Sequence, residues 1–153
     1  MTGRDPGLTQ ICFRSYGIKY ATAQMVNQTP HASGDKGWII STASIFGLVA
    51  DKGVSSYAAS KGAVVNLTRA AAMDCAEHRI HVNCICPGYT QSAMTEPVFA
   101  NSDVKKALIE RHPFGGRLGE PEDLARGCVF LASEDARWVT GVALPIDGGF
   151  TAR

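Results

Sequence analysis

Short apolar runs alternate with longer helical patterns along this chain, and that alternation limits the folds open to it. The runs that predict buried strands are "GWIIST" at 37–42, "RIHVNCIC" at 79–86 and "GVALPID" at 141–147. Strands alternating with helices predict an α/β fold, with a doubly wound parallel sheet and helices on both faces. Because Pro145 lacks a backbone N–H, the third strand should lie at an edge of the sheet.

Four segments between and before these runs predict helices. The first covers 16–28, after an irregular start at about 1–15. The second is Ala-rich and covers 57–78, with Ser55 or Ser56 as its N-cap. The other two predicted helices cover 101–112 and 120–133. No repeat or linker interrupts the chain, so residues 1–153 are expected to form a single domain or part of one.

Composition excludes several classes of partner. Hydrophobic residues make up 45% and charged residues 19% of the 153 residues, as in ordinary globular domains. A formal charge of +1 gives no electrostatic reason to expect nucleic acid or an anionic membrane as partner. No apolar run is long enough to span a bilayer, and the first thirty residues show no secretory pattern.

Cysteine and histidine usage predicts neither disulfides nor a metal site. The number of cysteines, five, is odd, and no two of them form a Cys-x-x-Cys pair. This usage favours free thiols and a cytoplasmic location. Cys84 and Cys86 are expected on opposite faces of their strand. The four histidines have no metal-ligand spacing and are expected at the surface or in the core.

Polar residues follow two of the predicted strands. Ser44 comes two residues after the strand at 37–42, and Tyr57 and Lys61 lie in the first turns of the next helix. The Pro87–Ser92 segment directly follows the strand at 79–86. Ligands of parallel α/β sheets bind beyond the carboxyl ends of the strands, so we expect these groups at one rim.

Tyr57 and Lys61 are four residues apart and therefore share a face of their helix. The pKa of a free tyrosine is about 10, and a nearby ammonium favours the phenolate. The pair is thereby suited to exchange protons with an alcohol or carbonyl oxygen, and Ser44 is placed to hydrogen-bond the same oxygen. A Tyr-x-x-x-Lys spacing alone is also compatible with an exposed pair of no function.

Five motifs in order resemble the short-chain dehydrogenase/reductase family over residues 17–150. "SYAASKGAVV" is similar to the family's active-site helix, and "IISTASIFG" to its serine strand, with Ser44 thirteen residues before Tyr57. "VNCICPGYTQSAM" resembles the turn that contacts nicotinamide. The closing helix and strand of the family are matched by "GRLGEPEDLARGCVFLAS" and "VTGVALPIDGG". The resemblance implies a partial Rossmann-like sheet.

The resemblance also implies hydride transfer between NAD or NADP and an alcohol or ketone. Tyr57 would be the general acid/base, Lys61 would lower the tyrosine pKa and bind the nicotinamide ribose, and Ser44 would position the substrate oxygen. With Tyr57 and Lys61, the nicotinamide end would contact the turn residues Pro87, Gly88, Thr90 and Ser92. The family's dimers imply a homodimer or homotetramer through the helices at 16–28 and 57–78.

Two features depart from the family pattern. Gln10 stands where an asparagine usually supports a proton relay. "TGRDPGLT" at 2–9 echoes the family's glycine-rich phosphate loop, but no strand precedes it and Thr9 replaces the last glycine. We therefore interpret this start as that of a truncated domain. The alternative function is a catalytically inactive relative that acts at most as an oligomerisation partner.

Overall fold

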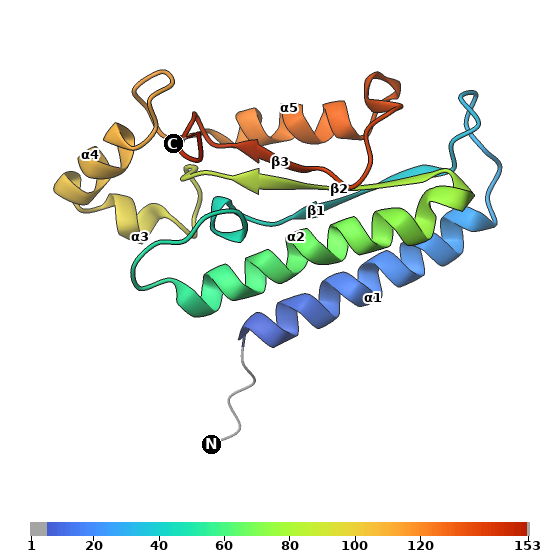
Figure 1. Ribbon diagram of the computed structural model, residues 1–153. Helices are drawn as coiled ribbons and strands as arrows, with labels where there is room; N and C mark the ends of the chain where they lie inside the picture. Colours follow the sequence, from blue (N-terminus) through green and yellow to red (C-terminus); the bar gives the residue numbers. More distant parts are fainter. Residues whose placement is uncertain (1–5, 153) are drawn as a thin grey trace.

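A three-stranded parallel sheet forms the centre of the protein (Figure 1). The computed structural model describes residues 6–152, with strands β1 (Gly37–Thr42), β2 (Ile80–Pro87) and β3 (Ala143–Ile146). Their order is β1-β2-β3, with Gly37 opposite Ile80 and Cys84 opposite Ala143. The predicted α/β fold with a parallel sheet is confirmed.

The strand positions follow from what each strand can bury and bond. β2 is central, and its apolar run is buried almost throughout, as expected for a strand covered on both faces. β3 pairs with β2 alone among the described strands. This edge position tolerates Pro145, which has no N–H to donate to a second neighbour.

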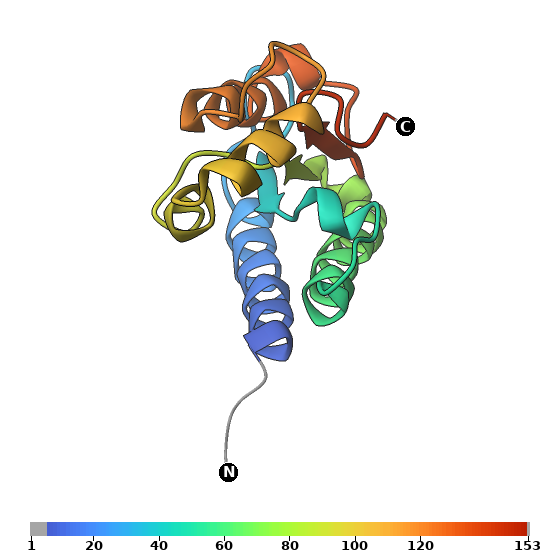
Figure 2. The same ribbon diagram turned by 90° about the vertical axis from the view of Figure 1, so that its left-hand side faces the viewer.

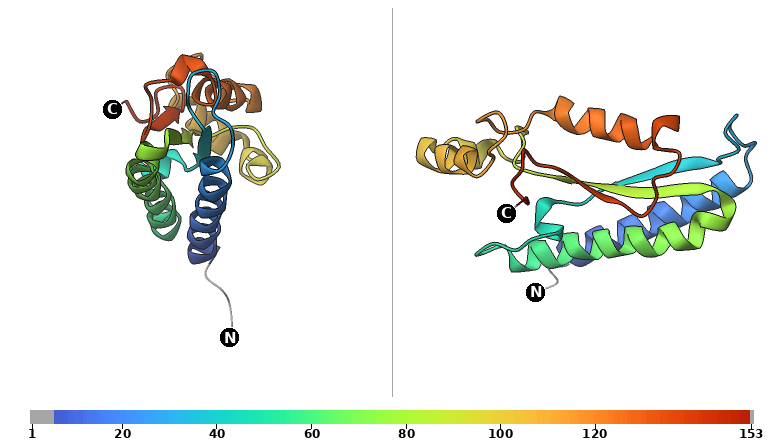
Figure 3. Two further views of the ribbon diagram at one scale, coloured as in Figure 1. Left: turned by 90° about the vertical axis from the view of Figure 1, so that its right-hand side faces the viewer. Right: turned by 45° about the horizontal axis from the view of Figure 1, so that its top comes forward.

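Two long helices lie side by side and cover one face of the sheet (Figures 1 and 3). These are α1 (Pro6–Val26) and α2 (Ser55–Cys75), and the 3₁₀ turn η2 (Ala76–His78) extends α2. Ala71 and Ala72 of α2 pack in a buried cluster with Ile18 of α1 and the β2 residues Ile80 and Val82. The small alanines let α2 approach the sheet closely.

Helix α5 (Pro121–Leu131) covers the opposite face (Figure 1). Gly127 permits this approach, because a Cβ there would lie 2.3 Å from Cδ1 of Ile146 on β3.

Two shorter helices, α3 (Glu96–Phe99) and α4 (Ser102–Glu110), lie beyond the carboxyl ends of the strands (Figure 2). The 3₁₀ turns η1 (Ile45–Gly47) and η3 (Glu134–Ala136) complete the elements. No described helix has the length and apolarity to cross a membrane.

The first two predicted helices start at other residues than expected, and one expected strand geometry is wrong. The irregular start is shorter than 1–15, because α1 begins at Pro6, a residue tolerated in a first turn. Residues 6–9 of "TGRDPGLT" are therefore helical, and residues 2–5 lie outside the described residues. Helix α2 begins at Ser55 itself, with Val54 at the cap and no side-chain cap bond.

Cys84 and Cys86 share one face of β2 rather than opposite faces, since side chains two residues apart on a strand point the same way. Both are buried with Val64 and Val65 of α2. The two neighbouring thiols perturb each other: the interaction with Cys86 lowers the pKa of Cys84, and the interaction with Cys84 together with burial raises the pKa of Cys86.

Candidate active site

A cavity of about 470 Å³ opens at the carboxyl ends of β1 and β2. Its walls come from the β1–η1 segment, the first turns of α2, the turn after β2 and the approach to α3. All the residues predicted for the site line it: Ser44, Tyr57, Lys61, Pro87, Gly88, Thr90 and Ser92. The rim expected from chain order is therefore a single cavity.

Ser44 is buried and held in place by the turn that follows it. It is the N-cap of η1, where its Oγ accepts a hydrogen bond of 3.2 Å from the backbone N–H of Phe46. Ile45 and Phe46 anchor this turn in a buried aromatic cluster with Phe150. Because Oγ acts as the acceptor in this bond, its own proton is left to donate to a ligand.

Lys61 lies one helical turn after Tyr57, with its Nζ 5.7 Å from the centre of the tyrosine ring. The same Nζ donates a hydrogen bond of 3.3 Å to the carbonyl oxygen of Thr42, the last residue of β1. Burial is the main cause that lowers the pKa of Lys61, and the positive charge of Arg14 on α1 lowers it further. Tyr57 is 40% exposed, so its ring lies at the mouth of the cavity.

Gly47 lets η1 pack against the backbone of α2 beside Lys61. A Cβ at Gly47 would lie 2.8 Å from the carbonyl oxygen of Lys61, a separation that real side chains do not adopt. This contact sets the distance between the segment that carries Ser44 and the helix that carries Tyr57 and Lys61. The glycine is thus a spacer between the two halves of the site.

The turn after β2 is fixed by hydrogen bonds and by close packing. Gly88 donates its N–H to the carbonyl oxygen of Ile146, and a Cβ at Gly88 would lie 2.8 Å from Cα of Asp147. Thr90 donates its hydroxyl to the carbonyl oxygen of Gly88 at 3.1 Å. Tyr89 donates its N–H to Nε2 of His112 at 3.3 Å.

The sequence did not single out His112, although this buried side chain connects the end of α4 to the turn. Its Nδ1 lies 2.6 Å from the carbonyl oxygen of Leu108, so an Nδ1–H tautomer leaves Nε2 to accept from Tyr89. Tyr89 lies 23 residues away along the chain, and the contact is to its backbone. No spacing pattern reveals such a contact.

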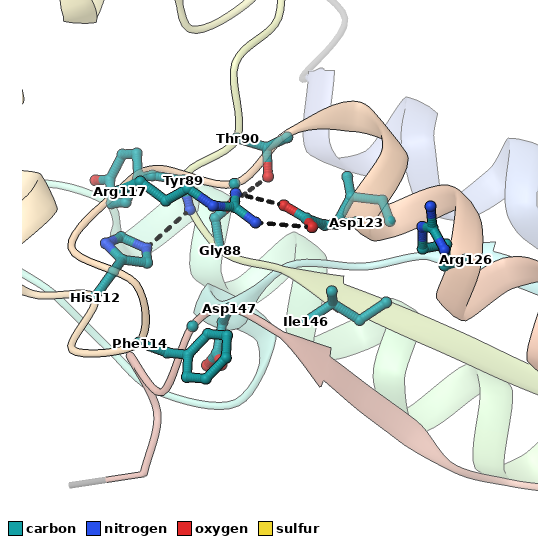
Figure 4. A pocket seen from close by; sticks show the side chains of 13 residues that line it. Gly88, Tyr89, Thr90, His112, Phe114, Arg117, Asp123, Arg126, Ile146 and Asp147 are labelled. Atoms are coloured by element: carbon teal, nitrogen blue, oxygen red, sulfur yellow. Dashed lines mark hydrogen bonds and ion pairs between the residues drawn. The ribbon is translucent and has the colours of Figure 1, made fainter.

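A second, smaller cavity of about 240 Å³ adjoins the same turn (Figure 4). Gly88, Tyr89 and Thr90 line both cavities. Arg117 spans this one and makes hydrogen bonds of 2.7 and 3.0 Å to the carboxylate of Asp123 (Figure 4). Those bonds are the main cause that lowers the pKa of Asp123 to about 2. The ion pair ties the start of α5 to the segment before it.

The described residues fit one end of a dinucleotide better than the other. The cavity of about 470 Å³ has the backbone groups of the Pro87–Ser92 turn, together with Tyr57 and Lys61, to contact a nicotinamide and its ribose. Within residues 6–152 no glycine-rich loop between a strand and a helix is present to hold a diphosphate. Gln10 lies on α1. The described residues form no cluster of three or more metal-ligating side chains.

The parallel sheet with helices on both faces and a cavity at its carboxyl edge defines a Rossmann-like α/β protein. The family model described as enoyl-(acyl carrier protein) reductase matches residues 14–151. The chain belongs to the short-chain dehydrogenase/reductase family.

Relatives and solved structures agree with this assignment. A meso-2,3-butanediol dehydrogenase of Serratia marcescens is 42% identical over 123 residues, 80% of this chain and 48% of that protein. A gluconate 5-dehydrogenase of Burkholderia cenocepacia, solved with NADP and tartrate, aligns with a TM-score of 0.76 at 32% identity, over 86% of this chain and 49% of that one. A 4-hydroxyisoleucine dehydrogenase complexed with NADH aligns with a TM-score of 0.72 at 36% identity, over 76% of this chain and 48% of that one. The chain spans about half the length of the relatives it matches.

Proposed function

We propose that this chain carries the catalytic part of an NAD- or NADP-dependent alcohol or carbonyl oxidoreductase, as part of one Rossmann-type domain. The observation that carries the proposal is the single cavity that Ser44, Tyr57, Lys61 and the Pro87–Ser92 turn share. The names of the relatives, which are dehydrogenases of diols and hydroxy compounds, support the same reaction class. The NADP- and NADH-bound neighbours support both coenzymes.

In the proposed reaction the bound coenzyme supplies or accepts the hydride. Ser44 donates its hydroxyl proton to the substrate oxygen and holds that oxygen near Tyr57. Tyr57 gives a proton to this oxygen when a ketone is reduced, and removes it when an alcohol is oxidised. The charge of Lys61 stabilises negative charge on the Tyr57 oxygen during this transfer.

The coenzyme contacts are proposed for the same residues. Tyr57 and Lys61 face the nicotinamide ribose, and the turn residues contact the nicotinamide ring: Pro87, Gly88, Thr90 and Ser92. The hydrogen bonds within the turn hold its backbone in one conformation before the coenzyme arrives. A preorganised turn lowers the entropic cost of binding.

A second candidate function is that of a catalytically inactive subunit. This alternative concerns the 153 residues taken by themselves, since residues 6–152 contain no diphosphate-binding loop. Such a chain contributes at most to assembly.

For either function we propose a homodimer or homotetramer through α1 and α2, because these helices expose large side chains: Phe13, Tyr16, Tyr20 and Met73. All five cysteines are free, which supports the proposed cytoplasmic location.

The experiment that tests the catalytic proposal is Tyr57→Phe in this chain fused to the nucleotide-binding half of the butanediol dehydrogenase relative. We expect NAD(P)-dependent turnover to fall by about 10²-fold or more, since proton transfer is lost. Coenzyme affinity should stay within about threefold, because the ring remains. Tyr20→Phe, at an exposed site on α1, is the matched control. Turnover of Tyr57→Phe within a few-fold of the parent would contradict the assignment.

A further inference from the structure

The walls of the catalytic cavity are largely apolar and nearly uncharged. Its apolar side chains come from segments far apart in the chain: Ile45, Phe46, Val54, Met94, Val98 and Leu124. Lys61 is the single charged side chain among the described residues that line it. A ligand that fills this cavity therefore meets hydrocarbon over much of its surface.

Two of these apolar side chains are exposed where the cavity opens. Met94 is 82% exposed and Val98 is 42% exposed, although both are large and apolar. Met94 lies in the loop that precedes α3, and Val98 lies within α3. Exposed apolar side chains gathered at one cavity indicate a surface that a partly apolar ligand covers.

Three hydroxyls on the same side of the cavity make hydrogen bonds within the protein. Thr95 donates its hydroxyl to the carbonyl oxygen of Thr90 at 2.6 Å, and Ser92 and Thr95 share a hydrogen bond of 3.1 Å. Thr90 donates to Gly88. A polyhydroxylated ligand gains few unused partners from these hydroxyls.

The described lining offers no cation for a substrate carboxylate besides Lys61. One donor of its Nζ is used by the carbonyl oxygen of Thr42, and in the proposed reaction its charge acts on Tyr57. No arginine or histidine is among the described residues that line the cavity. A carboxylate moved from water into such a site without an ion pair incurs a large desolvation cost.

We propose that the substrate of this site is an uncharged secondary alcohol or ketone whose remaining carbon skeleton is hydrocarbon. This inference rests on the proposed function, since it identifies the Ser44–Tyr57 pair as the place of the substrate oxygen. The hydrocarbon part lies against Ile45, Met94 and Val98. Because Lys61 is the one cation in the described lining, sugar acids and other hydroxy carboxylates should bind this cavity more weakly than uncharged ketones.

Direct binding to the 153-residue chain tests this class without coenzyme or turnover. The chain is labelled with ¹³C in its methionine methyl groups and titrated with cyclohexanone or with gluconate. Met94 reports on the cavity, and Met73, 79% exposed on α2 and outside the cavity lining, is an internal control. We expect cyclohexanone to shift the Met94 signal alone, and gluconate to shift neither. An equal or stronger response of Met94 to gluconate, or no response to cyclohexanone at 50 mM, overturns the proposal.

A pair of matched variants adds a second readout. Val98→Lys places a charge at the cavity and should weaken cyclohexanone binding by roughly three- to tenfold. Val104→Lys adds the same charge on α4, at a valine that is 41% exposed and does not line the cavity, and should leave binding unchanged. Both sites are exposed, so both variants should keep the parent circular dichroism spectrum. Equal effects of the two variants contradict the proposed location.

The outcome is separable from that of the proposed function. In the fused enzyme, turnover of gluconate without turnover of cyclohexanol refutes the substrate class and leaves the Ser44–Tyr57–Lys61 assignment intact. Selective binding of cyclohexanone, together with undiminished turnover by Tyr57→Phe, supports the substrate class and refutes the catalytic assignment.

Discussion

Lys61 donates a hydrogen bond from Nζ to the carbonyl oxygen of Thr42 over 3.3 Å, and so joins α2 to the last residue of β1. Thr42 lies two residues before Ser44 in the chain. The bond therefore connects the helix of the proposed acid/base to the segment of the proposed substrate-binding serine. It also directs the ammonium toward the cavity rather than toward bulk solvent.

Replacing Lys61 with methionine separates this structural role from the proposed chemical one. Loss of one partly exposed hydrogen bond should cost about 0.5–1.5 kcal/mol of unfolding free energy. Coenzyme affinity and turnover of the fused enzyme should both fall, turnover by about 10²-fold or more. Lys52→Met, at an exposed lysine outside the cavity lining, is the control. A change in stability alone would mean that Lys61 is only structural.

Gly47 and Gly62 predict opposite effects of the same substitution. Gly47→Ala should destabilise the chain by about 1–3 kcal/mol, because its Cβ would lie 2.8 Å from the carbonyl oxygen of Lys61. Gly62 lies inside α2, and the nearest atom to a new Cβ there is 3.8 Å away. Because alanine has a higher helix propensity than glycine, Gly62→Ala should stabilise the chain by up to about 1 kcal/mol. Urea unfolding of both variants measures the difference, and effects of the same sign would refute the spacer role of Gly47.

The Arg117–Asp123 pair predicts how stability changes in acid. The pKa of Asp123 is lowered from 3.8 to about 2, so its stabilising effect is complete above the unfolded value. As the pH falls from about 4 to about 2, the carboxyl group is protonated in the unfolded chain but still ionised in the folded one. Proton binding therefore favours the unfolded chain, and the stabilising effect is lost over this range. Asp123→Asn should flatten the fall of the unfolding midpoint over this range. Glu122→Gln, one residue earlier in α5, should leave the fall as steep as in the parent.

The exposed residues of α1 predict self-association. Sedimentation velocity at micromolar concentration should show a dimer or tetramer, and Tyr20→Glu should shift it toward monomer, because a buried unpaired charge weakens an interface. Phe114→Glu, at another exposed aromatic residue far from α1 in sequence, should leave the oligomeric state unchanged. A folded parent that sediments as a monomer would contradict the proposed interface.

The 153-residue chain by itself should bind coenzyme poorly. In Rossmann-type domains the diphosphate is held at the start of a helix after a glycine-rich loop, and residues 6–152 contain none. Calorimetric titration with NAD(H) and NADP(H) should give a Kd above about 0.1 mM and no turnover. Saturation at micromolar coenzyme would show that other groups bind the phosphates.

Local sequence patterns were enough to predict the class of fold and to bring the proposed site residues together. Apolar runs that alternate with helical patterns are local properties, and three parallel strands and their order along the chain follow from them. The edge position of β3 could be predicted because Pro145 lacks a backbone N–H, a property that a single residue reveals. The shared helix face of Tyr57 and Lys61 follows from their four-residue spacing. The start of α1 was mispredicted, since Pro6 and Gly7 look like a loop in isolation and are compatible with a first turn.

The surroundings of those residues depend on long-range packing and could not be predicted. The contacts of Lys61 with Thr42, of Gly47 with the α2 backbone and of His112 with Tyr89 all join segments distant in sequence. Their partners are backbone atoms, which every residue has, so no pattern of side chains reveals them. The apolar walls formed by Ile45, Met94 and Val98 likewise exist only once the chain is folded. Local spacing identified the chemical groups, and long-range packing decided the shape and charge of the cavity that holds them.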